Sequence, residues 1–253
     1  MKKFMKNYKK ISIITVTKNS QKTIESTIKS FIKQDYKNKE LILVDGKSSD
    51  KTISIIKKYK KKISKIITEK DKGIYDALNK GFKNSKGEVI GILHSDDNYK
   101  NEKVLSKIMK FFNDKNVSLV HTNVEIKYKK FKRIFNSKKQ FNNDDFSKGL
   151  MPPHTGIFLK KKVLNQIGFF DLEFKYAADL DFIIRCFKRQ EIKKKYYNIK
   201  SVNMLSGGTS TKNFINIAKQ NIEWFKILNK NEINYNIFTF LFYKLINRLS
   251  QII

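Results

Sequence analysis

The first hundred residues alternate short apolar runs with stretches in which apolar residues recur at helical spacing. Four apolar runs, at 11–16, 40–44, 63–68 and 89–93, have the length of buried strands. Between them lie three segments typical of amphipathic helices, at about 23–34, 53–59 and 73–81. Right-handed crossovers return successive strands in the same direction and place helices on both faces of the sheet. The sequence therefore predicts an α/β fold with a doubly wound, mostly parallel sheet.

Polar clusters follow three of the four apolar runs. They are Thr17-Lys18-Asn19, Asp45-Gly46-Lys47-Ser48-Ser49-Asp50 and His94-Ser95-Asp96-Asp97. A parallel sheet brings such clusters to one edge, where the ligands of open α/β sheets bind. Carboxylates accept hydrogen bonds from base N–H groups and ribose hydroxyls. The three clusters together predict a nucleotide site.

The phosphates of such a nucleotide need a partner other than a glycine-rich loop. The sequence has no G-x-G-x-x-G after the first strand and no G-x-x-x-x-G-K-[ST], which excludes the dinucleotide-binding and P-loop classes. Asp96 and Asp97 can instead hold a divalent cation through oxygen ligands, and that cation can hold a diphosphate. Taken alone, an Asp-Asp pair after a strand is more often a polar turn or a helix cap.

The formal net charge of +31 allows three interpretations. Nucleic-acid binding and attraction to an anionic membrane surface are two, and a lysine-biased composition is the third. The lysines are spread along the whole length and accompanied by abundant Asn, Ile, Tyr and Phe, which favours the compositional cause. We rank the anionic membrane surface second and expect no nucleic-acid partner.

The expected cellular compartment follows from three features that the sequence lacks, namely a disulfide framework, a membrane-spanning stretch and a signal peptide. The single Cys186 excludes a disulfide framework and suits a reducing cytosol. No apolar stretch approaches the roughly 20 residues that span a bilayer, and the basic segment 1–10 precedes too short an apolar run for a signal peptide. We expect a cytoplasmic protein, peripheral at the inner face of the cell membrane.

Four motifs in this order and spacing resemble family-2 glycosyltransferases of the GT-A fold, of the surface-polysaccharide type. The motifs are 13–19 (IITVTKN), 40–52 (ELILVDGKSSDKT), 71–81 (DKGIYDALNKG) and 93–97 (LHSDD), and the match covers roughly residues 10 to 210. The resemblance implies a nucleotide-diphosphate sugar donor, a Mg²⁺ or Mn²⁺ ion, and inversion at the anomeric carbon.

The resemblance also assigns roles to residues. It implies a metal site at Asp97 with Asp96 nearby, and donor contacts from Thr15, Thr17, Asn19, Asp45, Asp71, Lys72, Asn79 and Asp96. Many family members carry two acids after the second strand, where this chain has Asp45-Gly46. Asp45 is therefore the leading candidate at that turn for a contact to base or ribose, with Asp50 next.

The segment 168–185 resembles the part of the family that carries the general base. Glycosyl transfer needs a carboxylate to accept the proton of the acceptor hydroxyl. Asp179 and Asp181 differ by about 200° around a helix and cannot face one pocket together. The pattern assigns Asp179 as the base and leaves Asp181 facing solvent or paired with an arginine, although acids at a helix start are also typical of capping. His154 and Arg185 are weaker candidates for acceptor contacts.

The remaining pattern divides the chain. Residues 1–205 are predicted to form the transferase domain, with a nucleotide-binding half at about 10–100 and an acceptor half at about 101–205. The elements expected in the acceptor half are a helix at 104–112, a strand at 117–121, a hairpin at 124–135, a mobile loop at 141–150, a strand ending near 159 and a helix through 163–167. Residues 206–253 hold a polar loop, a helix at 214–228 and an apolar tail at 237–249, which suits an interfacial helix or one packed on the domain.

The sequence thus predicts an inverting, metal-dependent glycosyltransferase that moves a sugar from a nucleotide-diphosphate sugar to a hydroxyl of a surface glycan or of a lipid-linked acceptor, such as a polyprenyl-linked one. Two alternatives stay open. A polyprenyl-phosphate sugar synthase has the same fold and donor, and a basic nucleic-acid-binding protein would use the net charge. The second alternative lacks any reader motif, and its lysines are not clustered.

Overall fold

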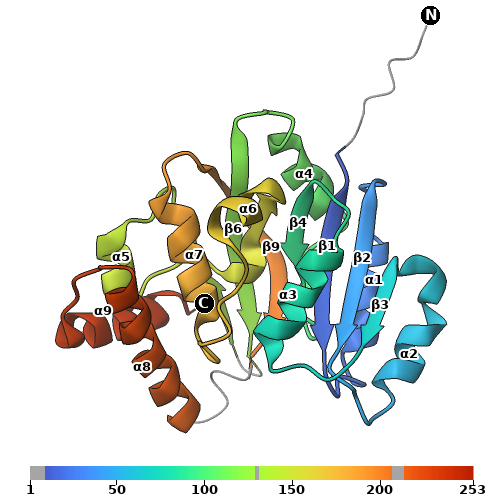
Figure 1. The fold of residues 1–253 in the computed structure, drawn as a ribbon, viewed down its shortest axis with the longest axis horizontal. Helices are drawn as coiled ribbons and strands as arrows, with labels where there is room; N and C mark the ends of the chain where they lie inside the picture. Colours follow the sequence, from blue (N-terminus) through green and yellow to red (C-terminus); the bar gives the residue numbers. More distant parts are fainter. Residues whose placement is uncertain (1–8, 129–130, 207–213, 253) are drawn as a thin grey trace, which may run out of the picture.

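A computed structural model describes residues 9–128, 131–206 and 214–252. One mixed sheet runs through the molecule (Figure 1), in the order β3-β2-β1-β4-β8-β6-β9-β5, with β7 paired to β6. The strands are β1 (Ile11–Thr17), β2 (Lys39–Asp45), β3 (Lys65–Thr68), β4 (Val89–Ile92), β5 (Asn98–Tyr99), β6 (Val117–Lys127), β7 (Lys132–Phe135), β8 (Ile157–Lys160) and β9 (Lys193–Leu205).

Helices cover both faces of this sheet. They are α1 (Ile24–Ile32), α2 (Thr52–Lys58), α3 (Ile74–Asn84), α4 (Val104–Phe111), α5 (Asn143–Ser147), α6 (Lys162–Ile167), α7 (Ala178–Lys188), α8 (Phe214–Lys230) and α9 (Ile237–Ser250), with the 3-10 turns η1 (Lys60–Lys62) and η2 (His154–Gly156). One apolar core joins the sheet to α3, α6, α7 and α8. A second core on the other face joins it to α1, α2 and α4.

The first half of the sheet is parallel, as the alternating pattern predicts. β1 pairs in parallel with both β2 and β4, and β2 pairs in parallel with β3. The direction changes at β8, which is antiparallel to both β4 and β6. The predicted hairpin at 124–135 is confirmed as the antiparallel pair β6–β7.

One expectation for the second half is wrong, and one of its strands was not predicted. Residues 141–150 were expected to form a mobile loop, but α5 lies within them and begins with a capping box between Asn142 and Asp145. Phe146 of α5 is fully buried, so apolar packing holds this segment in place. The sequence also gives no sign of β9, whose lysine-rich start lacks alternation, although β9 lies between β6 and β5 in the sheet.

The C-terminal helices pack on the rest of the chain at the end of the molecule that holds α5 and α7 (Figure 1). Trp224 of α8 donates a hydrogen bond from Nε1 to the carbonyl of Phe146, at 3.2 Å. Phe240 of α9 is fully buried against the rings of Trp224 and Phe225. None of the helices within the described ranges combines the length and apolar character that crossing a bilayer requires.

Candidate active site

The turns after β1 and β2 interlock at the carboxyl edge of the sheet. Thr17 and Asp45 are paired at the ends of the two strands. Both carboxylate oxygens of the fully buried Asp45 accept hydrogen bonds from Ser48, from its N–H at 3.0 Å and its hydroxyl at 2.5 Å. Asn19, with φ at 51°, accepts a hydrogen bond on Oδ1 from the N–H of Ser49 at 2.9 Å. The two turns therefore form one preformed polar surface.

Asp71 joins this surface because residue 46 is glycine. A Cβ added at Gly46 would lie 2.2 Å from Oδ2 of Asp71, so the Asp71 carboxylate occupies the space that a side chain would take. Its Oδ1 accepts a hydrogen bond from the N–H of Gly73 at 3.1 Å, next to the start of α3. Many family members have an acid at the position of Gly46. In this chain the Asp71 carboxylate, which comes from another turn, occupies the space of that side chain.

The other residues predicted to contact the sugar donor lie in different surroundings. Thr15 and Thr17 are buried on β1, and neither hydroxyl has a hydrogen-bond partner within the described ranges. Lys72 is exposed, and its N–H donates to Asp76.

Asn79 is buried, and its side-chain amide makes two hydrogen bonds with the backbone of Phe170, at 2.9 and 3.0 Å. This residue therefore anchors α3 to the loop before α7. Asp50 accepts from the N–H groups of Gln21 and Thr52 at the start of α2.

The acidic turn after β4 holds two different carboxylates. Asp96 is partly exposed, and partial burial raises the pKa of its carboxyl group. Asp97 is 1% exposed, and its Oδ2 has no hydrogen-bond partner among the described residues. Burial, and then the neighbouring charge of Asp96, raise the pKa of Asp97 well above its ordinary value. Ser95 ties this turn to the one after β1 through its hydroxyl, 2.9 Å from that of Ser20.

The two carboxylates of this turn provide only part of the ligand set that a divalent ion needs. The described residues contain no group of three His, Cys, Asp or Glu side chains placed to share a metal. Mg²⁺ is commonly held by one or two carboxylates together with substrate phosphates, so a dedicated protein cage is not required. Asp96 reaches the surface, whereas Asp97 lies behind it with an unpaired oxygen. Hard oxygen donors of this kind suit Mg²⁺ or Mn²⁺.

Asp179 lies in the first turn of α7, with partners on both oxygens. Oδ1 accepts from the hydroxyl of Tyr75 and from the N–H of Leu180, both at 3.0 Å, and Oδ2 lies 3.3 Å from Nδ1 of His154. Burial acts to raise the pKa of Asp179, but the contacts with His154, Tyr75 and Leu180 outweigh it and lower the pKa. The carboxylate form that a general base needs is therefore favoured.

A pair of histidines connects Asp179 to the acidic turn. Nε2 of His154, on η2, lies 2.8 Å from Nε2 of His94, which follows β4. Burial, followed by the nearby His154, lowers the pKa of His94 to about 3. His94 is consequently neutral at physiological pH, and it stands two residues before Asp96.

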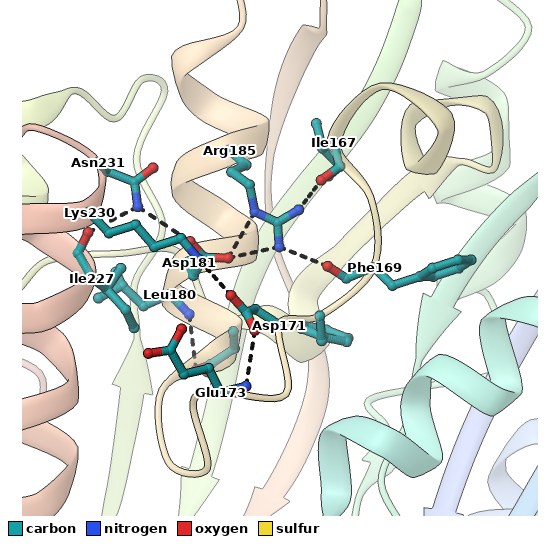
Figure 2. A network of polar contacts seen from close by, with 12 residues as sticks. Ile167, Phe169, Asp171, Glu173, Leu180, Asp181, Arg185, Ile227, Lys230 and Asn231 are labelled. Atoms are coloured by element: carbon teal, nitrogen blue, oxygen red, sulfur yellow. Dashed lines mark hydrogen bonds and ion pairs between the residues drawn. The ribbon is translucent and has the colours of Figure 1, made fainter.

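Asp181 and Arg185 belong to a network of their own, which joins α7 to the loop before it and to α8 (Figure 2). Asp181 is 1% exposed and accepts from Arg185 on Oδ2, with Nε and Nη2 both at 2.8 Å. Arg185 also donates to the carbonyls of Ile167 and Phe169, and Asn231 of α8 donates to Oδ1 of Asp181 at 3.3 Å. Of the two alternatives for Asp181, pairing with arginine is confirmed and facing solvent is wrong. Arg185 is engaged in holding the loop before α7, which leaves its predicted acceptor contact without support.

The sequence pattern does not predict the roles of two residues of this region, Tyr75 and Glu223. Tyr75 lies 104 positions from Asp179 in the chain, and only the fold brings its hydroxyl to the carboxylate. Glu223 of α8 accepts hydrogen bonds from three successive N–H groups, those of Lys175, Tyr176 and Ala177. It thereby fixes the loop from which α7 begins. A lone acid on a helical segment carries no such signal in the sequence.

Curated relatives of this chain are glycosyltransferases. A PGL/p-HBAD biosynthesis glycosyltransferase of Mycobacterium bovis is 27% identical over 206 residues, which cover 79% of each chain. The UDP-Glc:alpha-D-GlcNAc-diphosphoundecaprenol beta-1,3-glucosyltransferase WfaP of Escherichia coli is 32% identical over 179 residues, covering 69% of this chain and 68% of WfaP.

Solved structures of glycosyltransferases share the fold, which is therefore the GT-A type. The mannosyltransferase PcManGT of Pyrobaculum calidifontis, in complex with GDP-Man and Mn²⁺, superposes with a TM-score of 0.65 at 16% identity, over 97% of this chain and 72% of that one. S. aureus TarS 1-349 in complex with UDP-GlcNAc gives 0.65 at 20% identity, over 78% of this chain and 58% of that one. The family description "Glycosyl transferase family 2" matches residues 12–172, well over half of the sequence. The chain is a glycosyltransferase and belongs to glycosyl transferase family 2.

Proposed function

We propose that this chain is an inverting, metal-dependent glycosyltransferase that moves a sugar from a nucleotide-diphosphate sugar to a hydroxyl of a surface glycan or lipid-linked acceptor. The observation that carries the proposal is the short chain of contacts from Asp179 through His154 to His94, two residues before Asp96. These contacts support Asp179 as a general base beside the turn that would hold the donor diphosphate. In this proposal residues 1–205 form the transferase domain, and 206–253 form a C-terminal helical unit.

In the proposed mechanism, Asp179 accepts the proton of the acceptor hydroxyl while that oxygen attacks the anomeric carbon. The bond from the anomeric carbon to the nucleoside diphosphate breaks on the opposite face, and this single displacement inverts the anomeric centre. Asn19, Asp45 and Asp71 line the polar surface that would receive the nucleoside. A Mg²⁺ or Mn²⁺ ion on Asp96, with Asp97 behind it, would supply positive charge to the departing diphosphate.

The base distinguishes a hydroxyl acceptor from the polyprenyl-phosphate alternative. A phosphate oxygen is already ionised at neutral pH and has no proton to give. Asp179 has Tyr75, Leu180 and His154 as partners and a lowered pKa, so it stays ionised and can accept the proton of a hydroxyl. We therefore favour a hydroxyl. Because the acceptor named for WfaP carries a diphosphoundecaprenol group, a lipid-linked glycan is our preferred acceptor.

A lipid-linked acceptor requires contact with a membrane surface, and α9 has a face suited to it. Phe238, Phe242, Leu245 and Leu249 are 83%, 60%, 59% and 59% exposed. Their spacing of four, three and four residues places them along one side of the helix, opposite the buried Phe240. No acidic residue follows Glu232. We propose that this face lies in the interface of an anionic membrane, which would place the enzyme at the inner face of the cell membrane.

A donor screen tests the proposed function. The protein is incubated with UDP-glucose, UDP-GlcNAc or GDP-mannose, each with and without Mn²⁺ or Mg²⁺, and its Tm is measured. A donor at about 100 times its Kd stabilises the fold by ~2.7 kcal/mol, which is a Tm rise on the order of 5–10 °C for a chain of this size.

We expect stabilisation by one donor class that depends on the metal and is lost in Asp96→Asn. The matched control is Asp114→Asn, which changes an exposed acid in the turn before β6 and should leave the shift intact. A donor shift that needs no metal, or that survives in Asp96→Asn, would contradict the proposed metal site. Stabilisation by DNA and by no donor would favour the nucleic-acid alternative.

A further inference from the structure

The hydrogen-bond partners of Asp179 leave one position of its carboxylate open. A carboxylate has about four lone-pair positions, two on each oxygen. Tyr75 and Leu180 both donate to Oδ1, and the N–H of Leu180 is shared with the carbonyl of Ala177 at 2.9 Å, so both positions of Oδ1 are engaged. Oδ2 has His154 as its single partner among the described residues, at 3.3 Å. The remaining position, on Oδ2, is therefore the place where the proton of an acceptor hydroxyl can be received.

When both rings are neutral, the same contacts fix which ring nitrogens carry protons. Nδ1 of His154 faces a carboxylate and must donate to it, so a neutral His154 has a bare Nε2. That Nε2 lies 2.8 Å from Nε2 of His94, and His94 must then be the donor in the pair. Nδ1 of His94 is bare in this arrangement, and it is buried without a partner within the described ranges. The arrangement agrees with the general observation that an unpaired buried acceptor is tolerated better than an unpaired buried N–H.

We infer that His154 is a positioning residue for glycosyl transfer, which presents Oδ2 of Asp179 to the acceptor hydroxyl, and that His94 sets the tautomer in which His154 does so. The inference deepens the proposed function and rests on Asp179 being the base. His154, which the sequence analysis placed among the acceptor contacts, acts here through Asp179 rather than on the substrate itself.

The role of His94 follows from its place in the chain. It is the second residue after β4 and stands two residues before Asp96, in the turn to which we assign the donor diphosphate. A change in that turn is passed to His154 through a single hydrogen bond and then to the base. The donor turn and the base are therefore held as one unit, and a shift of either by about 1 Å would cost on the order of 100-fold in rate.

The proton balance of the step is simple. The O–H bond of the acceptor breaks, the new bond from that oxygen to the anomeric carbon forms, and the proton ends on Oδ2 of Asp179. The electron pair of the broken glycosyl bond leaves with the nucleoside diphosphate. Tyr75 and Leu180 keep Oδ1 occupied throughout, so the proton is not received on the wrong oxygen.

The first test needs no substrate. The chain contains three histidines, so the imidazole ¹⁵N signals of His94, His121 and His154 are assigned by replacing one histidine at a time. At pH 9, we expect His154 to be protonated on Nδ1 and bare on Nε2, and His94 to show the reverse. Asp179→Leu should remove this preference at His154. A bare Nδ1 on His154 in the unmodified protein would overturn the inference.

The second test separates positioning from folding. Transfer is measured with UDP-glucose and an α-D-GlcNAc-diphosphoundecaprenol acceptor, as named for WfaP. His154→Leu should lower kcat by about 10- to 100-fold with donor KM unchanged. His154→Asn keeps an N–H donor near the position of Nδ1 and should recover most of the rate. The matched control is His121→Asn, which keeps a donor toward Ser137 in a separate aromatic cluster and should leave kcat unchanged.

Combining variants distinguishes failure of the inference from failure of the proposed base. If His154 acts through Asp179, adding His154→Leu to Asp179→Asn should cause no further loss, because the two residues act as one unit. An inactive Asp179→Asn beside a fully active His154→Leu would overturn this inference and leave the base standing. An active Asp179→Asn would overturn both. Losses that multiply in the double variant would show that His154 acts independently of the base.

Discussion

Asp179 and Asp181 stand two residues apart on α7, yet their surroundings differ completely. Asp179 has Tyr75, Leu180 and His154 as partners and keeps an open position on one oxygen. Asp181 is enclosed by the guanidinium of Arg185 and the amide of Asn231 (Figure 2). An ion pair enclosed in this way supports the fold and cannot exchange protons with a substrate. The identity of the partner, rather than the type of acid, separates the two roles.

Replacing each acid by its amide should therefore give different results. Asp179→Asn should lower the transfer rate by roughly 10²–10⁴-fold, the usual share of general base catalysis, with donor affinity little changed. Asp181→Asn leaves Arg185 without its counter-charge and should destabilise the fold by about 3–5 kcal/mol, with a much smaller effect on kcat. Initial rates, donor titrations and urea denaturation measure these quantities. An inactive, stable Asp181→Asn beside an active Asp179→Asn would reverse the assignment.

At the residue scale, the sequence predicts identities better than contacts. The choice of Asp179 over Asp181 follows from the motif and stays a prediction, and the Arg185 partner of Asp181 agrees with helical spacing of four residues. The direction of the Asn79 amide could not be predicted, because its partner Phe170 lies 91 positions away. Tyr75 escaped for the same reason. Long-range hydrogen bonds leave no periodic trace in a sequence.

Among the elements, the amino-terminal ends of three strands are joined by one buried acid. Glu40, at the start of β2, accepts from the hydroxyl of Ser12 on β1 at 2.5 Å and pairs with Lys10 at 2.6 Å. It also accepts from the N–H of Lys86, before β4, at 2.6 Å. Burial acts to raise the pKa of Glu40, but these contacts outweigh it, and the pKa lies below its ordinary value. The folded state therefore holds the charged form more favourably than the unfolded chain does.

Glu40 should give the fold a measurable dependence on pH. A carboxyl whose pKa is lower in the folded state adds stability above its unfolded pKa of about 4.3, and this stability is lost as pH falls through the folded value. Glu40→Gln should cost about 1–3 kcal/mol at pH 7 and should flatten the decline in acid. Urea denaturation at pH 7, 5 and 3.5 measures both effects. Parallel pH profiles for the two proteins would contradict this account of Glu40.

Helix α9 makes the membrane proposal testable without disturbing the fold. Phe238→Ser combined with Leu245→Ser removes two exposed apolar side chains and should weaken binding to anionic vesicles on the order of 10-fold or more per residue. Sedimentation with vesicles of phosphatidylglycerol measures the affinity. The control is Ile66→Ser, which removes an exposed apolar side chain from β3 and should bind as the unmodified protein does. Equal binding by the double variant would exclude α9 as the contact surface.

The elements that the sequence predicts well have either a continuous apolar run or a clear helical period. The strands β1, β2 and β4 are such runs, and the helices α1 and α3 show the period. These strands and the turns after them hold most of the residues proposed to contact the sugar donor. The reversed direction of β8 could not be predicted, because apolar runs carry no sign of strand orientation. α5 has five residues, too few for a helical period. The strand β9 begins with three lysines. Because this start has no alternation of apolar and polar residues, the sequence predicts neither the strand nor its place between β6 and β5.

At the scale of the whole molecule, the net charge of +31 should produce weak binding to any polyanion. Salt distinguishes this binding from a specific contact, since exposed charges are screened over about 8 Å at 0.15 M ionic strength. Raising salt from 50 to 200 mM should remove binding to duplex DNA of any sequence. Binding to anionic vesicles should fall but persist, because the apolar contacts of α9 are not screened. Fluorescence titrations at both salt concentrations measure this, and salt-resistant, sequence-specific DNA binding would contradict it.

The order of strands in the sheet has a consequence for how the protein is made. The strand β5 directly follows Asp96 and Asp97, and within the described part of the chain β9 is the one strand that pairs with it. The N–H of Leu205, at the end of β9, also stabilises the Asp97 carboxylate. During synthesis, β1 to β4 have left the ribosome long before β9, and domains acquire their contacts as the chain emerges. A nascent chain that ends before Lys193 thus contains the acidic turn without the strand that holds it, and the proposed donor site is completed only after β9 has been translated.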